Sequence, residues 1–298
     1  MTGEHGDRPG VLTDVPGVLV GHWTSPAGDT GCTVVLLPEG TVASGEVRGG
    51  APATREFALL EPTRMMQRVD AVVLSGGSAF GLATGDGVMQ YLAEHEIGFP
   101  TAGGVVPIVV GMSIYDLTVA TSGVRPTAAA GHAAAVAATD GPVLSGRIGG
   151  GAGATYRKWW GREGTRPGGV GMATVRAGDA IVSSLVIVNA LGDIDPGDGS
   201  LRAMPPERVL ATTPDIDPTL GTNTTIGVVV TNARLDKTQC LLLAQGGHDG
   251  YARSLVPAHT AADGDAILAA STGQIEADPV HLRVMATEAV TRAIRSLI

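Results

Sequence analysis

The stretch GTNTTIGVVV, residues 221–230, joins a loop to a strand. The segment before it, residues 192–222, is rich in proline, aspartate and glycine and predicts a long loop, which is usually functional or disordered. The β-branched run over residues 226–231 predicts a buried strand. Thr224 is therefore expected where a loop enters a strand, a place that suits a side chain that must be both rigid and reachable.

Around this strand the pattern of the sequence predicts a layered α/β chain. Further strands are expected within residues 17–24, 31–40, 69–75, 179–192 and 261–272, and helices within residues 78–95, 125–141, 236–255 and 278–298. The last helix has the clearest signals, because Asp278 can cap it and Pro279 can take its first position. Its expected buried stripe is Leu282, Met285, Ala286, Ala289, Ala293 and Leu297.

The composition bounds the class of protein. A chain of 298 residues with 44% hydrophobic and 16% charged residues predicts one large globular domain with a sizeable core, behind ten disordered N-terminal residues. The net charge of −9 and the lack of a basic run argue against a nucleic-acid partner. No apolar stretch reaches the roughly 20 residues that span a bilayer. We therefore expect a soluble, cytoplasmic protein in which Cys32 and Cys240 are small buried hydrophobes.

Three kinds of site find little support. The seven histidines are scattered without a HExxH or Cys/His cluster, so no metal is expected, and His132 and His248 are expected to be structural or surface residues. The turn SGGSAFG, residues 75–81, follows a strand and opens a helix, but its glycines match neither phosphate-binding fingerprint. It also lacks the second glycine of the GxSxG elbow of serine hydrolases. We interpret it as a close strand–helix turn.

Thr224 offers a more specific chemistry. A hydroxyl nucleophile needs a base, and an N-terminal threonine carries one in its own α-amine, whose ordinary pKa is about 7.7–8.0. An internal threonine gains that amine only if the bond between Asn223 and Thr224 is cut, and the threonine hydroxyl can make this cut by attacking the preceding carbonyl. The alternative is that Thr224 and Thr225 are ordinary threonines at a strand edge. Considered alone, the stretch favours this alternative.

Other segments favour the catalytic interpretation. They are LTDVPGVLVGHW (12–23), EVRGGAPATRE (46–56), VDAVVLSGGSAFGLATGDGVMQYL (69–92), VVPIV (105–109), VIVNALGD (186–193), NTTIGVVVTNA (223–233) and PAHTAADGDAI (257–267). In this order they resemble the P1 family of peptidases, peptidase family S58, which includes the L-aminopeptidase/D-esterase, the β-aminopeptidases and the nylon-oligomer hydrolase. The resemblance runs from about Leu12 to the C-terminus.

The resemblance implies a self-cleaving hydrolase without a metal or an organic cofactor. The cut falls between Asn223 and Thr224 and leaves an α chain of residues 1–223 and a β chain of residues 224–298, which stay associated. By motif, Lys158 matches the lysine of the threonine-type branch, and Asn189 matches its asparagine. Asp263 and Asp265 match its two aspartates.

Each of these types suits the chemistry. Asn189 can donate an N–H to an oxyanion, Lys158 can place a positive charge beside the nucleophile, and the aspartates can orient the threonine or bind an amine. The segment YRKWWGREGTRPGG, residues 156–169, is more basic and aromatic than the family pattern, so Tyr156 or Arg157 could share the role of Lys158.

The family also implies a four-layer αββα sandwich, layered like the N-terminal-nucleophile hydrolases but connected differently, and assembly as a homotetramer. The expected substrate is a small peptide or amide with a free amino end. Two alternatives stay open. One is acyl transfer of the kind catalysed by the ornithine acetyltransferase, and the other is a non-catalytic ligand-binding relative with the same fold.

Overall fold

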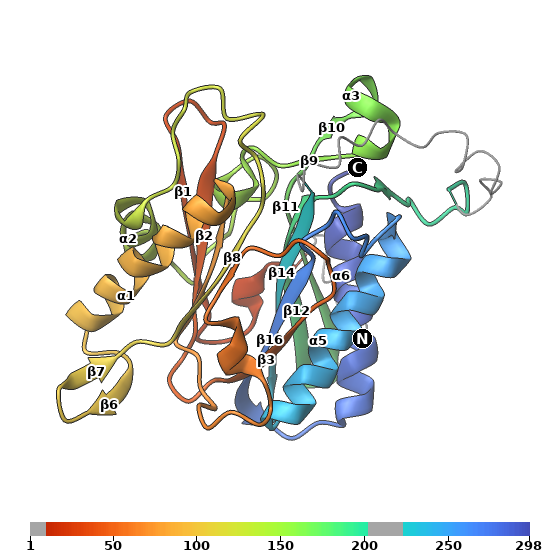
Figure 1. Cartoon of the computed structure of the whole chain (residues 1–298). Coiled ribbons are helices and arrows are strands. Elements are labelled where there is room, and N and C mark those ends of the chain that lie inside the picture. The colour runs from red at the N-terminus through yellow and green to blue at the C-terminus, as the bar shows by residue number, and fades with distance from the viewer. Residues whose placement is uncertain (1–9, 202–222) are drawn as a thin grey trace.

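The computed structural model of the chain contains two five-stranded sheets, each covered by a pair of helices (Figure 1). It describes residues 10–201 and 223–298, without the side chains of residues 160–162. The first sheet has the order β1 (Leu19–Thr24), β2 (Gly31–Leu36), β5 (Ala71–Ser75), β8 (Val109–Ser113) and β4 (Thr54–Arg55). The second has the order β11 (Gly169–Ala177), β12 (Ala180–Asn189), β14 (Thr224–Ala233), β16 (Ala266–Ile275) and β3 (Val42–Val47).

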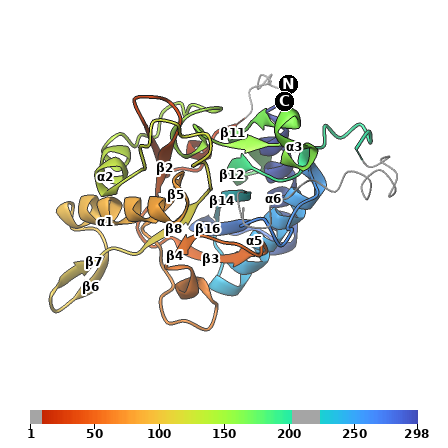
Figure 2. The same cartoon turned by 45° about the horizontal axis from the view of Figure 1, so that its top comes forward.

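The helices form the two outer layers (Figure 2). Helices α1 (Thr84–Glu94) and α2 (Ala128–Val136) pack on the first sheet, and α5 (Lys237–Ser254) and α6 (Pro279–Arg295) pack on the second. Viewed from one end, the layers follow one another as helices, sheet, sheet, helices. The predicted αββα sandwich is thereby confirmed.

Short elements connect these layers. They comprise three two-stranded pairs, β6 (Phe99–Thr101) with β7 (Gly104–Val106), β9 (Thr155–Tyr156) with β10 (Arg166–Pro167), and β13 (Asp193–Ile194) with β15 (Leu255–Val256). They also include α3 (Gly161–Gly164) and the 3-10 turns η1 (Leu12–Asp14), η2 (Phe57–Leu60), η3 (Ser78–Ala83), η4 (Gly149–Gly151) and η5 (Lys158–Trp160). The β13 strand lies in the expected loop 192–222, of which residues 202–222 are outside the described residues, as are residues 1–9 of the expected disordered terminus.

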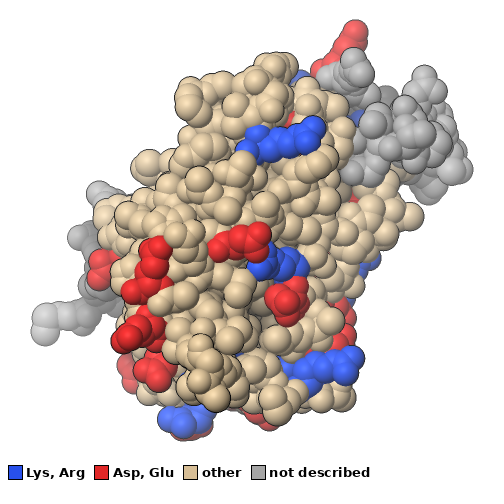
Figure 3. Space-filling view, turned by 60° about the vertical axis from the view of Figure 1, so that its left-hand side comes forward, with Lys and Arg blue, Asp and Glu red and all other residues tan. Residues whose placement is uncertain are grey.

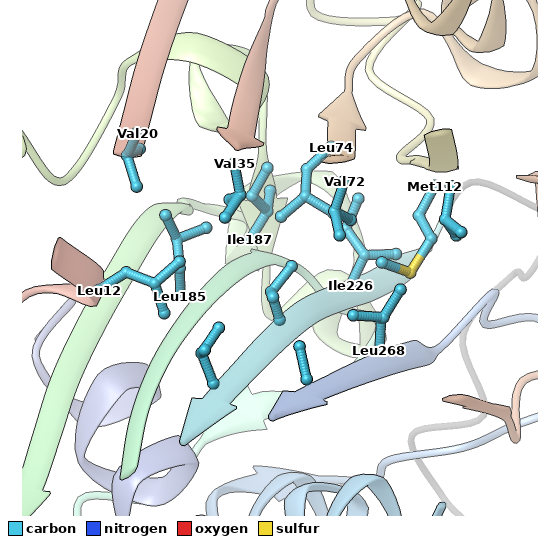
Figure 4. Packing of buried hydrophobic residues seen from close by; sticks show 14 of the residues in the cluster. Leu12, Val20, Val35, Val72, Leu74, Met112, Leu185, Ile187, Ile226 and Leu268 are labelled. Atoms are coloured by element: carbon cyan, nitrogen blue, oxygen red, sulfur yellow. The ribbon is translucent and has the colours of Figure 1, made fainter. Parts of the chain in front are cut away.

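The main core lies between the two sheets (Figure 4). The first sheet contributes Val35, Val72, Leu74 and Met112, and the second contributes Leu185, Ile187, Ile226 and Leu268. Two further apolar clusters lie between sheets and helices. One joins the second sheet to α5 and α6, and the other joins the first sheet to α1 and α2. Burying one such side chain stabilises the fold by about 1.5–3 kcal/mol, so three continuous clusters hold the four layers together.

Strand β14 is the central strand of the second sheet. It pairs antiparallel with β12 and parallel with β16, and all ten of its residues are buried. A strand covered on both faces has no need to alternate apolar and polar residues, which explains the continuous β-branched run. Thr224 is the first residue of this strand, as predicted.

Helices α5 and α6 lie close together against the second sheet. A Cβ atom on Gly246 would lie 2.6 Å from the Arg283 carbonyl oxygen, and one on Gly250 would lie 2.8 Å from the Thr287 carbonyl oxygen. These glycines therefore let the two helices approach each other. Asp278 caps α6 by accepting the Val280 N–H at 2.8 Å, and Pro279 begins the helix, which confirms both predictions.

Most of the predicted elements are present, but four strands of the two sheets were missed, namely β3, β4, β8 and β11. Strands β11 and β3 are the two edges of the second sheet, and their sequences GVGMATVRA and VASGEV contain glycine, serine and charged residues that weaken a strand signal. The cysteines agree with the prediction, since Cys32 and Cys240 are both buried free thiols. His248 is buried, and His132 forms a surface pair with Glu94.

Acidic side chains gather on the lower half of the face that carries α1, α2 and the β6–β7 hairpin, with few basic ones among them (Figure 3). This distribution follows the formal charge of −9 and favours cationic over anionic molecules near this face. Within residues 10–201 and 223–298, no helix combines the length and the apolar character needed to cross a membrane.

Candidate active site

The predicted nucleophile lies at one end of the second sheet. Thr224 pairs with Asn189 in the antiparallel register of β12 and β14, and only 4% of its surface is exposed. Strands β14 and β16 run parallel, so the residues before each strand meet at the same end of the sheet. Asn223 forms a bridge with Asp263 there, which brings the predicted cleavage bond beside the predicted aspartates.

The carbonyl group of Asn223 contacts two groups that bear on the predicted self-cut. Its oxygen accepts the Gly264 N–H at 2.9 Å and is also in close contact with the Thr224 hydroxyl, Oγ1. A Cβ atom on Gly264 would lie 2.6 Å from that hydroxyl and 2.7 Å from the Ala51 carbonyl oxygen. Glycine is therefore the residue that fits here, and its N–H polarises the carbonyl that Thr224 would attack.

Asn189 is fully buried and its amide is oriented at both ends. The amide oxygen, Oδ1, accepts the Lys158 ammonium at 2.8 Å and the Thr155 N–H at 3.0 Å. The amide nitrogen, Nδ2, donates to the Tyr115 carbonyl oxygen at 3.0 Å. These contacts fix the direction of the amide group.

Lys158 reaches the site because its loop is held against the end of β12. Arg157 adopts a left-handed backbone, with φ 65°, and its guanidinium donates to Asp193 at 2.8 Å. The Lys158 ammonium then donates to both oxygens of Asn189, at 2.8 and 3.1 Å. Desolvation lowers the pKa of Lys158 to about 7, although the nearby charges of Asp263 and Asp116 act in the opposite direction.

Asp263 is a buried carboxylate that holds three donors. Its Oδ1 accepts the Leu191 N–H at 3.3 Å, and its Oδ2 accepts the N–H and the hydroxyl of Thr260. Burial, with a further contribution from the charge of Asp265, raises the pKa of Asp263 to about 6. This group therefore titrates closer to neutrality than an ordinary aspartate, whose pKa is about 3.9.

Asp265 holds the strand that carries the nucleophile. Its Oδ1 accepts the backbone N–H of Thr225 at 2.7 Å, directly after Thr224. Its Oδ2 accepts both the backbone N–H of His259 at 3.0 Å and the ring nitrogen Nδ1 of His259 at 2.9 Å. The two predicted aspartates thus have different partners, Thr260 for the first and His259 for the second.

All the residues predicted by motif come together at this end of the sheet, namely Lys158, Asn189, Asn223, Thr224, Asp263 and Asp265. The two alternatives to Lys158 contact other groups. Tyr156 packs in the apolar cluster under α5 and α6, and Arg157 pairs with Asp193. Lys158 donates to Asn189.

Sequence reasoning missed three residues of this region. Gly264 and His259 lie within the motif PAHTAADGDAI, which contributed to the family resemblance, but no feature of the sequence indicated a role for either residue. Asp116 carried no sequence signal. Its buried carboxylate accepts the Thr30 hydroxyl and the Gly77 N–H, both at 2.7 Å, and burial raises its pKa. The SGGSAFG turn therefore has a structural partner in Asp116.

In the part of the chain that the structure describes, no group of three or more His, Cys, Asp or Glu side chains could hold a metal ion.

Comparison with known proteins finds a matching family. The model of peptidase family S58 matches residues 10–297. An uncharacterized aminopeptidase of Mycobacterium leprae is 42% identical over 295 residues, which cover 89% of this chain and 79% of the relative. A 6-aminohexanoate-oligomer endohydrolase of Paenarthrobacter ureafaciens is 31% identical over 280 residues, covering 88% of this chain and 75% of the relative.

Two solved structures are similar to the whole chain. A β-aminopeptidase from a Burkholderia species has a TM-score of 0.71 and 26% identity, and the match covers 97% of this chain and 87% of the other. An L-aminopeptidase D-Ala-esterase/amidase from Ochrobactrum anthropi has a TM-score of 0.73 at 20% identity, covering 98% and 87%. The second structure is described as a variant of the Ntn hydrolase fold, which fits the four layers seen here.

Proposed function

We propose that this chain, which belongs to peptidase family S58 and is an amide-bond hydrolase, cuts itself before Thr224 and then uses that threonine as its catalytic N-terminus. The observation that carries the proposal is the contact of the Thr224 hydroxyl with the carbonyl of Asn223, whose oxygen also accepts the Gly264 N–H. Nucleophile, target carbonyl and oxyanion donor are thus adjacent before any cut is made.

The self-cut needs a base, because an internal threonine has no α-amine. Lys158 supports this step, since a pKa of about 7 leaves a large fraction of its amine neutral at neutral pH. The Thr224 oxygen attacks the Asn223 carbonyl carbon, the C–N bond breaks, and the departing nitrogen takes up a proton. Water then hydrolyses the ester, which releases the Asn223 carboxylate and restores the hydroxyl of Thr224 beside its free amine.

The mature enzyme repeats this chemistry on its substrate. The new α-amine takes the proton of the Thr224 hydroxyl, and the amide of Asn189 helps to stabilise the oxyanion. Asp265 holds the strand through the Thr225 N–H, while the backbone of Asp263 pairs with that of Asn223 next to the cut. The chains 1–223 and 224–298 stay together because β14 is paired between β12 and β16 and shares their core.

The proposed substrates are small peptides or amides with a free amino end. The names of the relatives, aminopeptidase and 6-aminohexanoate-oligomer endohydrolase, support hydrolysis of amide bonds. Acyl transfer to an amine is the competing outcome, and comparing acetyl-ornithine plus glutamate with aminoacyl amides as substrates separates the two. The homotetramer and the cytoplasmic location stay predictions, and light scattering of the purified protein tests the first.

Intact mass measurement and N-terminal sequencing test the proposal directly. The wild type should yield two co-purifying chains, one beginning Thr-Thr-Ile-Gly, while Thr224→Ala should stay whole. Thr231→Ala, which removes a hydroxyl further along the same strand, is the matched control and should be cut. A wild type that remains one chain of 298 residues under all conditions would contradict the N-terminal threonine mechanism.

A further inference from the structure

The carboxylate of Asp265 is held by a histidine that has no part in the chemistry described above. One oxygen, Oδ1, accepts the Thr225 N–H, and the other, Oδ2, accepts two donors from His259, the backbone N–H and Nδ1. We propose that His259 is a positioning residue, which fixes Asp265 and through it the backbone that carries Thr224. This inference rests on the proposed function, because it assigns His259 a role in the same site.

The backbone of His259 supports a specific role. Its φ is 57°, in the left-handed region that a residue with a Cβ rarely adopts. In this conformation the N–H and the ring of the same residue reach the same carboxylate oxygen. The strained backbone is therefore the feature that lets one residue provide two donors to Asp265.

The ring of His259 is fixed by its neighbours. Its centroid lies 4.9 Å from that of His248 and 5.9 Å from that of Tyr251, and its Nε2 lies 3.4 Å from the His248 carbonyl oxygen. Its side chain is only 17% exposed, and that of Asp265 is 1% exposed. A ring held by two aromatic neighbours on α5 transmits the rigidity of that helix to the carboxylate.

Two hydrogen bonds connect the ring of His259 to the backbone beside the reacting Thr224: one from Nδ1 to Asp265 and one from the Thr225 N–H to Asp265. Without the ring, Asp265 keeps the backbone donor but loses the Nδ1 donor, so its carboxylate can rotate and the Thr225 N–H loses a fixed acceptor. A misplacement of about 1 Å at a reacting group can lower a rate on the order of 100-fold. We therefore expect His259 to act on the rate of self-cleavage and on kcat, more than on KM.

Three substitutions separate this role from a general contribution to packing. His259→Leu removes the donor, whereas His259→Asn keeps an N–H near the position of Nδ1 and tolerates a left-handed backbone. His259→Gln places its amide nearer the position of Nε2 and should not rescue. His132→Leu is the matched control, since it removes the 3.0 Å His132–Glu94 pair on the surface between α1 and α2.

Self-cleavage, followed by intact mass from freshly made protein, is the first readout. His259→Leu and His259→Gln should be cut about 10- to 100-fold more slowly than the wild type, while His259→Asn and His132→Leu stay within a fewfold of it. After cleavage, the leucine variant should lose kcat on an aminoacyl p-nitroanilide with KM little changed. Cleavage of His259→Leu at the wild-type rate would overturn the inference, as would an asparagine variant as slow as the leucine variant.

A second readout does not depend on cleavage. In the Thr224→Ala background, hydrogen exchange of the Thr225 amide is measured by mass spectrometry with and without His259→Leu. Exchange should become faster at Thr225 in the leucine variant and stay unchanged with His132→Leu. Unchanged exchange would overturn the role of His259 even if the chain cuts itself, whereas a wild type that is never cut would overturn the proposed function alone.

Discussion

Asn189 lies directly opposite Thr224 in the antiparallel pair of β12 and β14, although 34 other residues separate them in the chain. Asn189 is the last residue of β12 and Thr224 is the first residue of β14, so both lie where the sheet ends. The pairing register thus places a buried amide beside a buried hydroxyl. Because Lys158 donates to Asn189, the same pairing also brings the lysine near the bond between Asn223 and Thr224.

Replacing Asn189 tests its role as an oxyanion donor. Asn189→Ala should lower kcat about 100- to 1,000-fold, because removing one oxyanion donor costs roughly that factor. Steady-state kinetics of cleaved enzyme measure the effect. Asn232→Ala is the matched control, since this asparagine accepts the Ile181 N–H and donates to the Asp179 carbonyl at the far end of β14. A loss of kcat as large as this in the control would contradict the assignment.

Gly264 should be required for self-cleavage. Gly264→Ala places a methyl group 2.6 Å from the Thr224 hydroxyl, which must move away from the carbonyl of Asn223. We expect the variant to remain one chain on gels and in intact mass spectra. Gly103→Ala, in the turn between β6 and β7, meets no atom closer than 3.8 Å and serves as the control. Normal cutting of Gly264→Ala would show that this close approach is unimportant.

The rate of self-cleavage should depend on pH through Lys158. In the proposed mechanism the neutral amine of Lys158 is the base. Its pKa of about 7 then means that the rate falls as pH falls below 7, about tenfold per unit. Protonation of Asp263, with a pKa of about 6, should steepen the fall below pH 6. Refolding the chain at a series of pH values and measuring the uncut fraction gives the profile.

The two lysines of the chain provide the control for this profile. Lys158→Met should abolish the rise in rate across pH 7. Lys237 is also buried, but it donates to the carbonyls of Leu59, Arg64 and Met66. Lys237→Met should lower stability and leave the shape of the profile unchanged. A profile that loses its dependence in both variants would argue against Lys158 as the base.

The cap of the last helix should contribute to stability and not to activity. Asp278→Ala removes the acceptor of the Val280 N–H and should lower the free energy of unfolding by about 1 kcal/mol. Urea denaturation of uncut Thr224→Ala protein measures this difference without complication from two chains. Asp140→Ala, at an exposed position after α2, is the control and should change stability by less than about 0.5 kcal/mol.

Much of the fold could be predicted because local patterns were strong. The β-branched run of β14, the cap and proline of α6, and the apolar strands β2 and β12 each carry a signal within a few neighbouring residues. The edge strands β3 and β11 were missed because an edge strand needs less apolar surface and tolerates glycine and charge. Motif resemblance named the site residues, since their types and order are written in the chain.

By itself, the sequence determined the residue types, the strand entrance at Thr224 and the family. Only the tertiary structure decided how these groups act on one another. The lowered pKa of Lys158, the Gly264 N–H on the Asn223 carbonyl and the His259 ring on Asp265 all depend on burial and on partners that several separate segments supply. Desolvation and hydrogen-bond geometry are properties of a packed environment, and no local sequence pattern contains them.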